Sequence, residues 1–155
     1  MDRLWAPWRI KYVTQKKHTC IFCRAAKSRR DKDNFLLERR QYCFSVLNIF
    51  PYNNGHIMVA PYRHVGSLEK LKETEILDLL RLINKTKRDL DKCLKPDGYN
   101  IGLNIGKFAG AGFPGHLHIH IVPRWGGDTN FMPVVGNTKV ISQSLKELYQ
   151  RLKKC

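Results

Sequence analysis

The sequence lacks the features of a membrane or secreted protein. No apolar run approaches the roughly 20 residues that a membrane-spanning helix needs. The opening MDRLWAPWRIKYV has charged and aromatic residues but no apolar core, so we expect no signal peptide. Low-complexity tracts and internal repeats are also absent. A chain of 155 residues can bury a core without disulfides, and we expect a single cytoplasmic domain.

Acidic residues are scarce beside basic ones. Thirteen Asp and Glu face 28 Lys and Arg, which gives a formal net charge of +15. Such an excess raises the local concentration of anions, including nucleotides and nucleic acids, unless the lysines only solvate helix faces. The aromatic residues do not alternate with the basic ones, as a stacking platform for single strands requires. We therefore expect no nucleic-acid partner.

The cysteine pattern argues against a disulfide framework, because the count of five is odd and no secretory signal is present. Cys20 and Cys23 form a C-x-x-C, which in a cytosolic protein indicates metal or redox chemistry. No βαβ pattern surrounds the pair, so a thioredoxin-like site is disfavoured. Cys43 and Cys93 lie in apolar patterns and are expected to be buried, whereas the terminal Cys155 is expected to have no role.

Hydrophobic periodicity predicts an α+β fold. The predicted strands are 35–38, 41–48, 56–61, 99–106 and 116–123. The predicted helices are a short one within 20–31, a long one over 67–94 with Ser67 as its N-cap, and a last one over 140–152. Because the strands often follow one another directly, we expect an antiparallel sheet of about five strands with one long central helix and a C-terminal helix. Residues 1–19 are expected to be irregular or partly helical, anchored by Trp5 and Trp8.

Half of the six histidines fall in one short stretch, HLHIHI at 116–121. On a strand, His116, His118 and His120 would project the same way, about 6.6 Å apart. Imidazole is the side chain best suited to act as nucleophile, acid or base near neutral pH. A purely metal-binding tract is the alternative, but it would not need the glycine-rich loop that comes directly before this stretch.

That loop, NIGKFAGAGFPG at 104–115, has glycines at 106, 110, 112 and 115. Glycines let the backbone turn tightly and point N–H groups outward, and clusters of N–H groups form concave anion sites. A glycine-rich loop alone is weak evidence. Joined to a row of histidines, it indicates a phosphate held against a nitrogen nucleophile.

The stretch HLHIHIVPRW matches the H-φ-H-φ-H-φ-φ signature of the histidine triad (HIT) family, where φ is apolar. The resemblance extends to an N-x-G-H-φ-φ-φ-x-P segment at 54–61 and to Asn104, and it covers roughly 20–125. The opening MDRLWAPWR resembles the branch of diadenosine polyphosphate phosphorylases and hydrolases. The resemblance implies a HIT-like fold over 1–155, with 1–19 and 126–155 packed on the core. It also implies a homodimer paired through the strand near 99–105 and the long helix.

The resemblance also implies the catalytic roles. His118 matches the middle histidine, which attacks the α-phosphorus of a nucleotide and forms a covalent nucleotidyl-histidine. His120 matches the histidine that contacts phosphate and assists the leaving group. His56 matches a fourth histidine that hydrogen-bonds within the row, although it could simply end a strand. We expect a hydrolase or transferase acting on dinucleoside polyphosphates or AMP conjugates; the alternatives are a phosphorylase and a nucleotide-binding module without turnover.

By the same resemblance, Asn104 and the amides around Gly110, Ala111 and Gly112 would hold the non-reacting phosphate oxygens. Asn48 would bond the ribose hydroxyls. The residues expected to sandwich the base, an adenine by resemblance, are Ile21, Phe22, Val46, Leu47 and Ile49. Without the resemblance, these apolar residues read as ordinary core.

The match departs from the family pattern near position 112 and at Gly115, which comes before the triad and supplies no side chain to protonate a leaving group. Many relatives carry Ser or Gln near position 112, where this chain has Ala111 and Gly112, so the second step could use water or inorganic phosphate. We favour a hydrolase. Leaving-group specificity would lie in the poorly patterned 126–155; Trp125, Phe131 and Met132 either line that side or serve packing.

The C-x-x-C has the spacing of a structural zinc site. The resemblance implies that His64 and the first triad histidine, His116, complete the ligand set with Cys20 and Cys23. Two cysteines and two histidines would form a closed tetrahedral site, structural rather than catalytic. The alternatives are two reduced thiols with an exposed His64, or His18 as the fourth ligand. No organic cofactor is expected.

Overall fold

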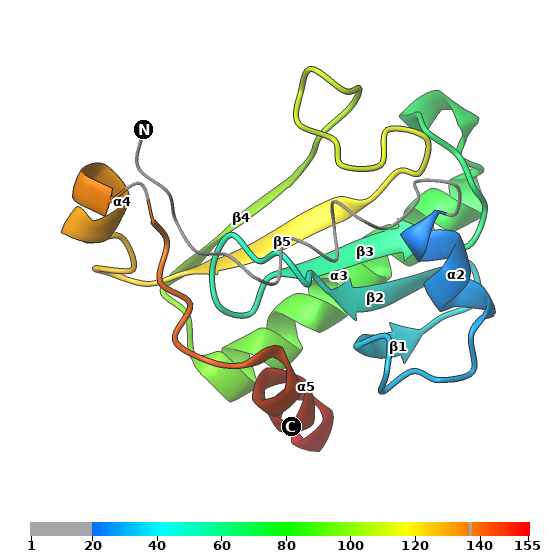
Figure 1. Ribbon diagram of the computed structural model, residues 1–155. Helices are drawn as coiled ribbons and strands as arrows, with labels where there is room; N and C mark the ends of the chain where they lie inside the picture. Colours follow the sequence, from blue (N-terminus) through cyan, green and yellow to red (C-terminus); the bar gives the residue numbers. More distant parts are fainter. Residues whose placement is uncertain (1–19, 137) are drawn as a thin grey trace.

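The computed structural model describes residues 20–136 and 138–155, and the described part is an α+β fold, as predicted (Figure 1). Its five strands form one sheet in the order β1-β2-β3-β5-β4, with every neighbouring pair antiparallel. The strands are β1 Leu36–Arg39, β2 Cys43–Leu47, β3 Ile57–Pro61, β4 Gly98–Leu103 and β5 Ile119–Arg124. The helices are α2 Ile21–Lys27, the 3-10 turn η1 Leu68–Lys70, α3 Glu73–Leu94, α4 Phe131–Gly136 and α5 Leu145–Lys154. Trp5, Trp8 and His18 lie outside the described residues.

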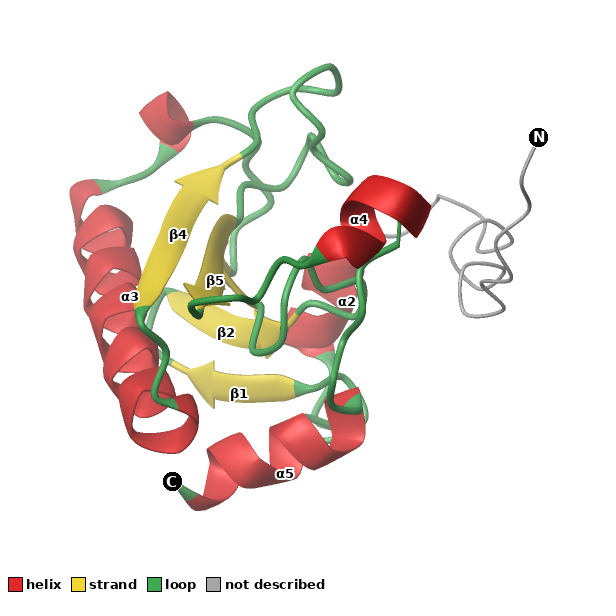
Figure 2. Ribbon diagram, turned by 90° about the vertical axis from the view of Figure 1, so that its left-hand side faces the viewer, coloured by secondary structure: helices red, strands yellow, loops and turns green. Residues whose placement is uncertain are grey.

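The sheet is covered differently on its two faces because strand side chains alternate. The long helix α3 lies across one face, and α5 lies at its edge beside β1 (Figure 2). The core on that face consists of Leu47, Ile57, Val59 and Ile121 packed against Leu79, Leu82, Leu90, Leu148 and Tyr149. On the other face, Phe22 and Ala25 of α2 pack with Phe44, Val46 and Met58. His120 lies between Ile119 and Ile121 and pairs in register with Met58, so its ring belongs to the α2 face.

The long helix begins later than the sequence indicates. Ser67 is extended and is followed by the 3-10 turn η1, so it is not the N-cap of α3. The helix begins at Glu73, because the Glu75 carboxylate accepts the Lys72 N–H at 2.8 Å and closes the first turn. Arg63 holds the same carboxylate at 2.6 Å. The predicted start was wrong by about one and a half turns. The observed start depends on the contact of Glu75 with Arg63, which lies outside the helix.

The C-terminal region also differs from expectation. The last helix begins at Leu145 rather than 140, because the Ser144 hydroxyl accepts the Glu147 N–H at 3.3 Å. The sequence did not predict α4. Cys93 and Cys155 form a disulfide, with Cα atoms 5.9 Å apart, so the expectation of an unlinked Cys155 without a role was wrong. Docking of α5 beside α3 brings together two cysteines 62 positions apart, which no local spacing reveals.

Cys43 and Cys93 are both buried, as predicted. Outside the disulfide, Cys20, Cys23 and Cys43 are free. Within 20–136 and 138–155, no helix is both long and apolar enough to cross a membrane.

Candidate active site and metal centre

The three triad histidines lie at the start of β5, on the face that α2 covers. Regular pairing begins at Ile119 and not at His116, because the Leu117 N–H donates to the Val65 carbonyl outside the sheet at 2.6 Å. All three imidazoles are buried. The ring of His118 is 4.9 Å from that of His120 between centroids. Phe22 packs against the rings of His118 and His116, at 4.7 and 5.1 Å. The predicted row therefore exists, although only its last member is inside the strand.

A backbone carbonyl fixes the tautomer of His118. Its Nδ1 lies 2.8 Å from the His116 carbonyl oxygen, which can only accept, so Nδ1 carries the proton. The neutral ring then has its lone pair on Nε2. Burial lowers the pKa of His118, which keeps the ring neutral near pH 7. The arrangement gives this histidine a nucleophilic nitrogen whose lone pair is available without a deprotonation step.

A chain of three hydrogen-bonding groups fixes the proton of His120. The Tyr52 N–H donates to Nδ1 of His56 at 3.0 Å, so the proton of His56 is on Nε2. That Nε2–H donates to Nδ1 of His120 at 2.9 Å, which leaves the His120 proton on Nε2. Among the described residues, His120 Nε2 is buried without a hydrogen-bond partner. A buried N–H of this kind is a donor that a ligand oxygen or nitrogen would satisfy.

Burial keeps both members of this pair uncharged. Burial, aided by the neighbouring His120 and His118, lowers the pKa of His56 from 6.5 to about 3. Burial, aided by His118, lowers the pKa of His120 to about 4. At neutral pH the site therefore combines a neutral nucleophile with a neutral proton donor.

Asn48 contacts the same network. Its Nδ2 lies 3.3 Å from His56 Nδ1, and its Oδ1 accepts the Phe50 N–H at 2.9 Å. The side chain is buried. It thus supports the His56 ring, a contact that the expected ribose role did not include.

The structure divides the residues predicted to hold the base. Phe22, Val46 and the half-buried Ile21 pack in one cluster on the α2 face. Leu47 lies on the opposite face, in the core beneath α3, and Ile49 is exposed. Strand alternation separates neighbours in sequence, so Val46 and Leu47 do not face the same ligand.

The glycine-rich loop holds two of its amides internally. The Gly110 N–H donates to the Lys107 carbonyl at 3.2 Å, and the Ala111 N–H donates to the Gly106 carbonyl at 3.3 Å. A phosphate bound by these amides would have to replace both bonds. Gly112 is exposed, and Asn104 Nδ2 lies 3.9 Å from where a Cβ of Gly110 would be. The structure therefore brings Asn104 beside the loop, as expected, without a preformed cradle of free amides at Gly110 and Ala111.

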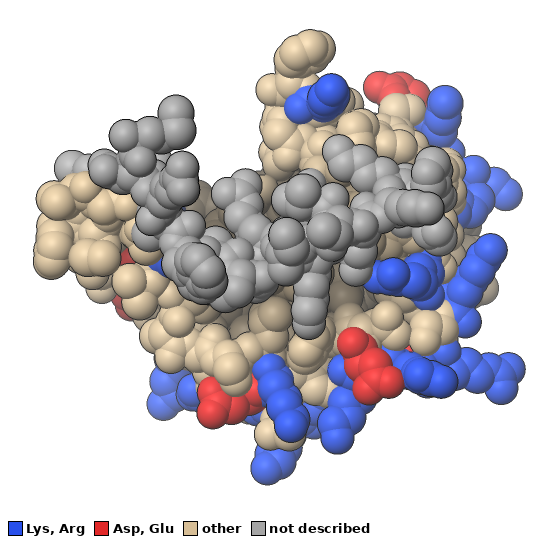
Figure 3. All heavy atoms as spheres, in the orientation of Figure 1, with Lys and Arg blue, Asp and Glu red and all other residues tan. Residues whose placement is uncertain are grey.

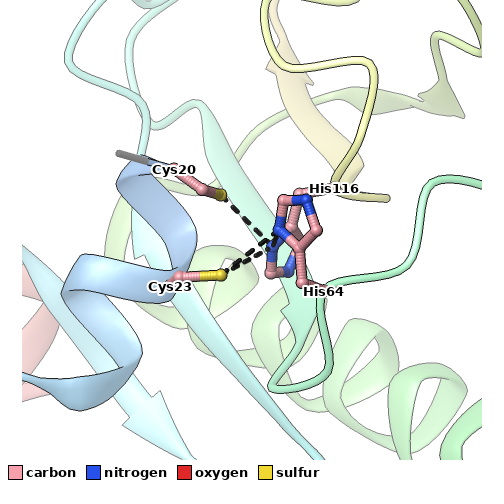
Figure 4. A group of neighbouring side chains, drawn as sticks. All are labelled: Cys20, Cys23, His64 and His116. Carbon is pink, nitrogen blue, oxygen red and sulfur yellow. Dashed lines mark hydrogen bonds between the residues drawn. The ribbon is translucent and has the colours of Figure 1, made fainter. Parts of the chain in front are cut away.

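The predicted metal ligands meet at the N-terminal end of α2 (Figure 4). Four candidate ligand atoms lie within 4.8 Å of one another, one each from Cys20, Cys23, His64 and His116. The Nδ1 atom of His116 is 3.3 Å from Cys20 Sγ and 3.5 Å from Cys23 Sγ. It is 3.2 Å from Nδ1 of His64. Residues far apart in the sequence therefore present four donors to one point.

The donor set fits a tetrahedral metal ion. Bond lengths of about 2.1 Å to nitrogen and 2.3 Å to sulfur place neighbouring ligand atoms roughly 3.4–3.8 Å apart, close to the observed spacing. The Nε2–H of His116 donates to the Pro61 carbonyl at 2.9 Å, so the lone pair of His116 is on Nδ1, which faces the cluster. Gly66 permits the close approach of the two loops, because a Cβ there would lie 2.9 Å from the Pro114 oxygen.

Several side chains near the site were missed or left open by the sequence. The ring of Tyr52 lies 4.5 Å from that of His56 and 5.5 Å from that of His120. Tyr52 belongs to PYNNG at 51–55, which has the Pro, Asn and Gly typical of a turn and no catalytic motif. Trp125 donates its indole N–H to the Lys95 carbonyl at 3.2 Å, a packing contact, whereas Phe131 is exposed and Met132 is half-buried.

Comparison with known proteins agrees with this geometry. Residues 29–127 match the family model of the HIT domain. The chain belongs to the HIT family. It is 38% identical over 156 residues to an AP-4-A phosphorylase of Mycobacterium tuberculosis, a match that covers 95% of this chain and 80% of the relative. It is also 34% identical over 86 residues to the asymmetrical bis(5'-nucleosyl)-tetraphosphatase of Schizosaccharomyces pombe, covering 56% and 47% of the two chains.

Solved HIT structures share the fold. A hypothetical histidine triad nucleotide-binding protein of Sulfolobus tokodaii superposes with a TM-score of 0.69 at 27% identity, covering 87% of each chain. A Zn-bound histidine triad family protein of Mycobacterium smegmatis gives a TM-score of 0.71 at 24% identity, covering 88% of this chain and 91% of that one. At that identity, the second comparison supports the fold alone.

Proposed function

We propose that this HIT protein cleaves phosphoanhydride or phosphoramidate derivatives of adenine nucleotides through a covalent bond to His118. The observation that carries the proposal is the pair of fixed tautomers at the end of β5. His118 Nδ1 donates to the His116 carbonyl, so the lone pair is on Nε2, and His120 keeps a buried N–H without a partner among residues 20–136 and 138–155. Relatives named as a phosphorylase, a tetraphosphatase and an adenosine 5'-monophosphoramidase support this substrate class.

The two steps follow from these proton positions. In the first, the lone pair of His118 Nε2 forms a bond to the α-phosphorus while the bond to the leaving group breaks. The leaving oxygen or nitrogen takes the proton from His120 Nε2, and the negative charge left on that ring lies beside the positive charge that the His118 ring gains on bonding to phosphorus. In the second step, an incoming oxygen attacks the phosphorus, the bond to His118 breaks, and His120 recovers a proton from the attacking group.

The direct test is a trapped intermediate. Wild-type protein mixed briefly with diadenosine tetraphosphate and quenched should gain the mass of one adenylyl group on the peptide that contains His118. His118→Ala should gain none while still binding AMP. If both proteins bind AMP and neither turns over any adenine derivative, the protein is a nucleotide-binding module and the proposal fails.

A phosphorylase is the second candidate, because the relative matched over 95% of this chain is named AP-4-A phosphorylase. Inorganic phosphate would replace water as the attacking group in the second step. Diadenosine tetraphosphate would then yield ATP and ADP, whereas hydrolysis would yield ATP and AMP. Chromatography of the products with and without phosphate separates the two reactions.

The excess of positive charge suits such polyanionic substrates. Lys and Arg atoms lie along the edges of the molecule that α2 and α5 occupy (Figure 3). On and after α2, Arg24, Lys27, Arg29 and Arg30 are exposed. Since the same helix places Phe22 against His118, these cations flank the candidate site.

We also propose that the cluster of two cysteines and two histidines binds zinc with a structural role. Its support is the donor spacing and the orientation of His116. The expected metal content is one zinc per chain by elemental analysis, and it should be lost in Cys20→Ala. Protein that is purified without chelators and refolded in zinc, yet contains none, would contradict the assignment.

A homodimer through β4 and α3 is a further proposal. Strand β4 is a sheet edge, and Ile101 on it is exposed. On α3, Ile76, Leu77 and Leu80 are exposed as well. Analytical ultracentrifugation should find a dimer that Leu80→Glu converts to a monomer; a monomeric wild type would contradict this. The cytoplasmic location expected from the sequence stays a prediction.

A further inference from the structure

We propose that Asn53 and Asp128 form a clamp that positions the proton donor of the reaction, and that both are positioning residues. The clamp would act through the turn between β2 and β3, whose Tyr52 N–H fixes the tautomer of His56. This inference rests on the proposed function, because it explains which nitrogen of His120 carries the proton that the ring delivers. Nothing in the sequence signature of the triad includes either residue.

Asp128 is the centre of a saturated network. Its carboxylate accepts from Asn53 Nδ2 at 2.7 Å. It also accepts from Arg124 Nε and Nη2 at 2.6 and 2.9 Å, from the Trp125 N–H at 3.1 Å and from the Thr129 hydroxyl at 3.1 Å. The Asp128 side chain is only 7% exposed. A buried carboxylate with this many donors has one orientation, so it gives Asn53 a fixed anchor.

Asn53 uses both amide hydrogens to anchor the turn. The second N–H donates to the Pro123 carbonyl at 3.0 Å, and the side chain is buried. Pro123 is in β5, three positions after His120. The turn that contacts His56 is therefore held to the same strand that carries the proton donor.

The clamp continues to the imidazoles through the backbone. The His56 N–H donates to the Asn53 carbonyl at 3.3 Å, and the Tyr52 N–H donates to His56 Nδ1 at 3.0 Å. Gly55 completes this tight turn with a φ of +77°, and a Cβ there would lie 2.8 Å from Leu94 Cδ1 and 3.0 Å from Pro123 Cγ. The turn thus packs closely against Leu94 of α3 and Pro123 of β5. Its backbone cannot shift without loss of this packing and of the hydrogen bonds to His56.

The consequence is a defined proton position. If the turn moves, Tyr52 no longer donates to His56 Nδ1, and only the longer contact with Asn48 Nδ2, at 3.3 Å, then favours the Nε2 proton of His56, so the Nδ1 tautomer becomes accessible. His120 Nδ1 would lose its fixed donor, and the proton of His120 would no longer be confined to Nε2. The nucleophile would be unaffected, because its tautomer depends on the His116 carbonyl.

Imidazole ¹⁵N NMR tests the clamp without any turnover. Long-range ¹H–¹⁵N correlation of wild-type protein should show His56 and His120 each protonated on Nε2 only. Asn53→Ala and the milder Asp128→Asn should shift both rings toward a mixture of tautomers, with His118 unchanged. Asn100→Ala is the matched control, because Asn100 accepts from Arg124 Nη1 at 2.7 Å, whereas Asn53 hydrogen-bonds Pro123 and Asp128.

Kinetics with two leaving groups separate positioning from general damage. The amine of an alkyl phosphoramidate of AMP must be protonated as it leaves, whereas p-nitrophenolate leaves the p-nitrophenyl ester of AMP as a stable anion. Loss of a general acid lowers kcat about 100-fold, so the clamp variants should lose about this factor on the amidate and little on the ester, with KM unchanged.

Equal losses on both substrates, or unchanged tautomers in folded clamp variants, would overturn the clamp. The NMR result and the proposed function can fail separately. Wild type inert on both substrates, yet with the tautomers stated, would remove the function and leave the clamp standing.

Discussion

Two histidines two positions apart, His116 and His118, have opposite orientations of the same ring. His116 donates its Nε2–H to the Pro61 carbonyl and directs Nδ1 to the thiols of Cys20 and Cys23. His118 donates its Nδ1–H to the His116 carbonyl and keeps Nε2 free. In each case a backbone carbonyl fixes the tautomer, and the other nitrogen keeps its lone pair for the proposed role.

The comparison shows that the residue type does not define the role. A metal ligand and a nucleophile both need an unprotonated, oriented nitrogen. The difference lies in which nitrogen the nearest carbonyl accepts from. The two halves are also coupled, because the residue proposed as a metal ligand supplies the carbonyl that holds the nucleophile.

The largest expected effect comes from removing the nucleophile. His118→Ala should lower kcat by at least about four orders of magnitude, since removal of a covalent nucleophile has effects of this size. Its zinc content should equal that of wild type, because no atom of His118 lies in the cluster. Steady-state assays and elemental analysis check both. A variant that retained a tenth of the activity would contradict the role of His118.

Removal of a proposed zinc ligand should first lower the stability of the folded protein. Zinc that binds only the folded protein stabilises it by about 4 kcal/mol when free zinc is 1,000-fold above the Kd. Cys20→Ala should abolish most of that zinc-dependent gain in denaturant unfolding. The carbonyl of His116 should then be less well fixed, so kcat should fall as well. Cys43→Ala, which changes a free buried cysteine outside the cluster, is the matched control and should keep the zinc response.

Acid should destabilise the catalytic half. The pKa values of His56 and His120 are lowered from 6.5 to about 3 and about 4, so between pH 6.5 and 4 the unfolded chain binds protons that the folded chain does not. The free energy of unfolding is therefore highest above pH 6.5. It decreases as the pH falls below 6.5, by up to about 1.4 kcal/mol per pH unit for each histidine. Urea unfolding between pH 4 and pH 7 measures the slope. His56→Gln should flatten it, and an unchanged slope in that variant would contradict the assignment.

The smallest effect is expected for the exposed ring of Tyr52. Tyr52→Leu removes the ring that lies over His56 and His120 but keeps the backbone N–H that fixes the tautomer. We expect kcat to change by less than about tenfold, below the roughly 100-fold or larger effect of losing general acid catalysis. The assay is the amidate substrate with wild type as reference. A loss as large as that of Asn53→Ala would show that the ring, and not the backbone N–H, controls the donor.

The parts of the site with a local signal could be predicted. Strand alternation grouped the triad, and the C-x-x-C spacing indicated a metal cluster before its four donors were seen together. In an apolar run, the sequence does not show that Val46 and Leu47 have different surroundings. The difference appears only in the structure, where the two residues lie on opposite covered faces of the sheet. The late start of α3 depends on Glu75, which accepts from the Lys72 N–H and pairs with Arg63, 12 positions away in a loop outside the helix.

The least predictable features are those that depend on loops meeting. The Cys93–Cys155 disulfide and the contact of Asp128 with Asn53 join positions 62 and 75 apart. Neither has a periodic or motif signal, because both arise only when the C-terminal region docks on the sheet.

The most direct measurement is the attachment point of the adenylyl group. Trapped enzyme can be digested and its modified histidine compared, by ³¹P NMR and chromatography, with standards substituted on Nδ1 and on Nε2. Because the His116 carbonyl holds the Nδ1–H of His118, we expect one adduct, on Nε2 of His118. An adduct on Nδ1, or on His116 or His120, would contradict the account.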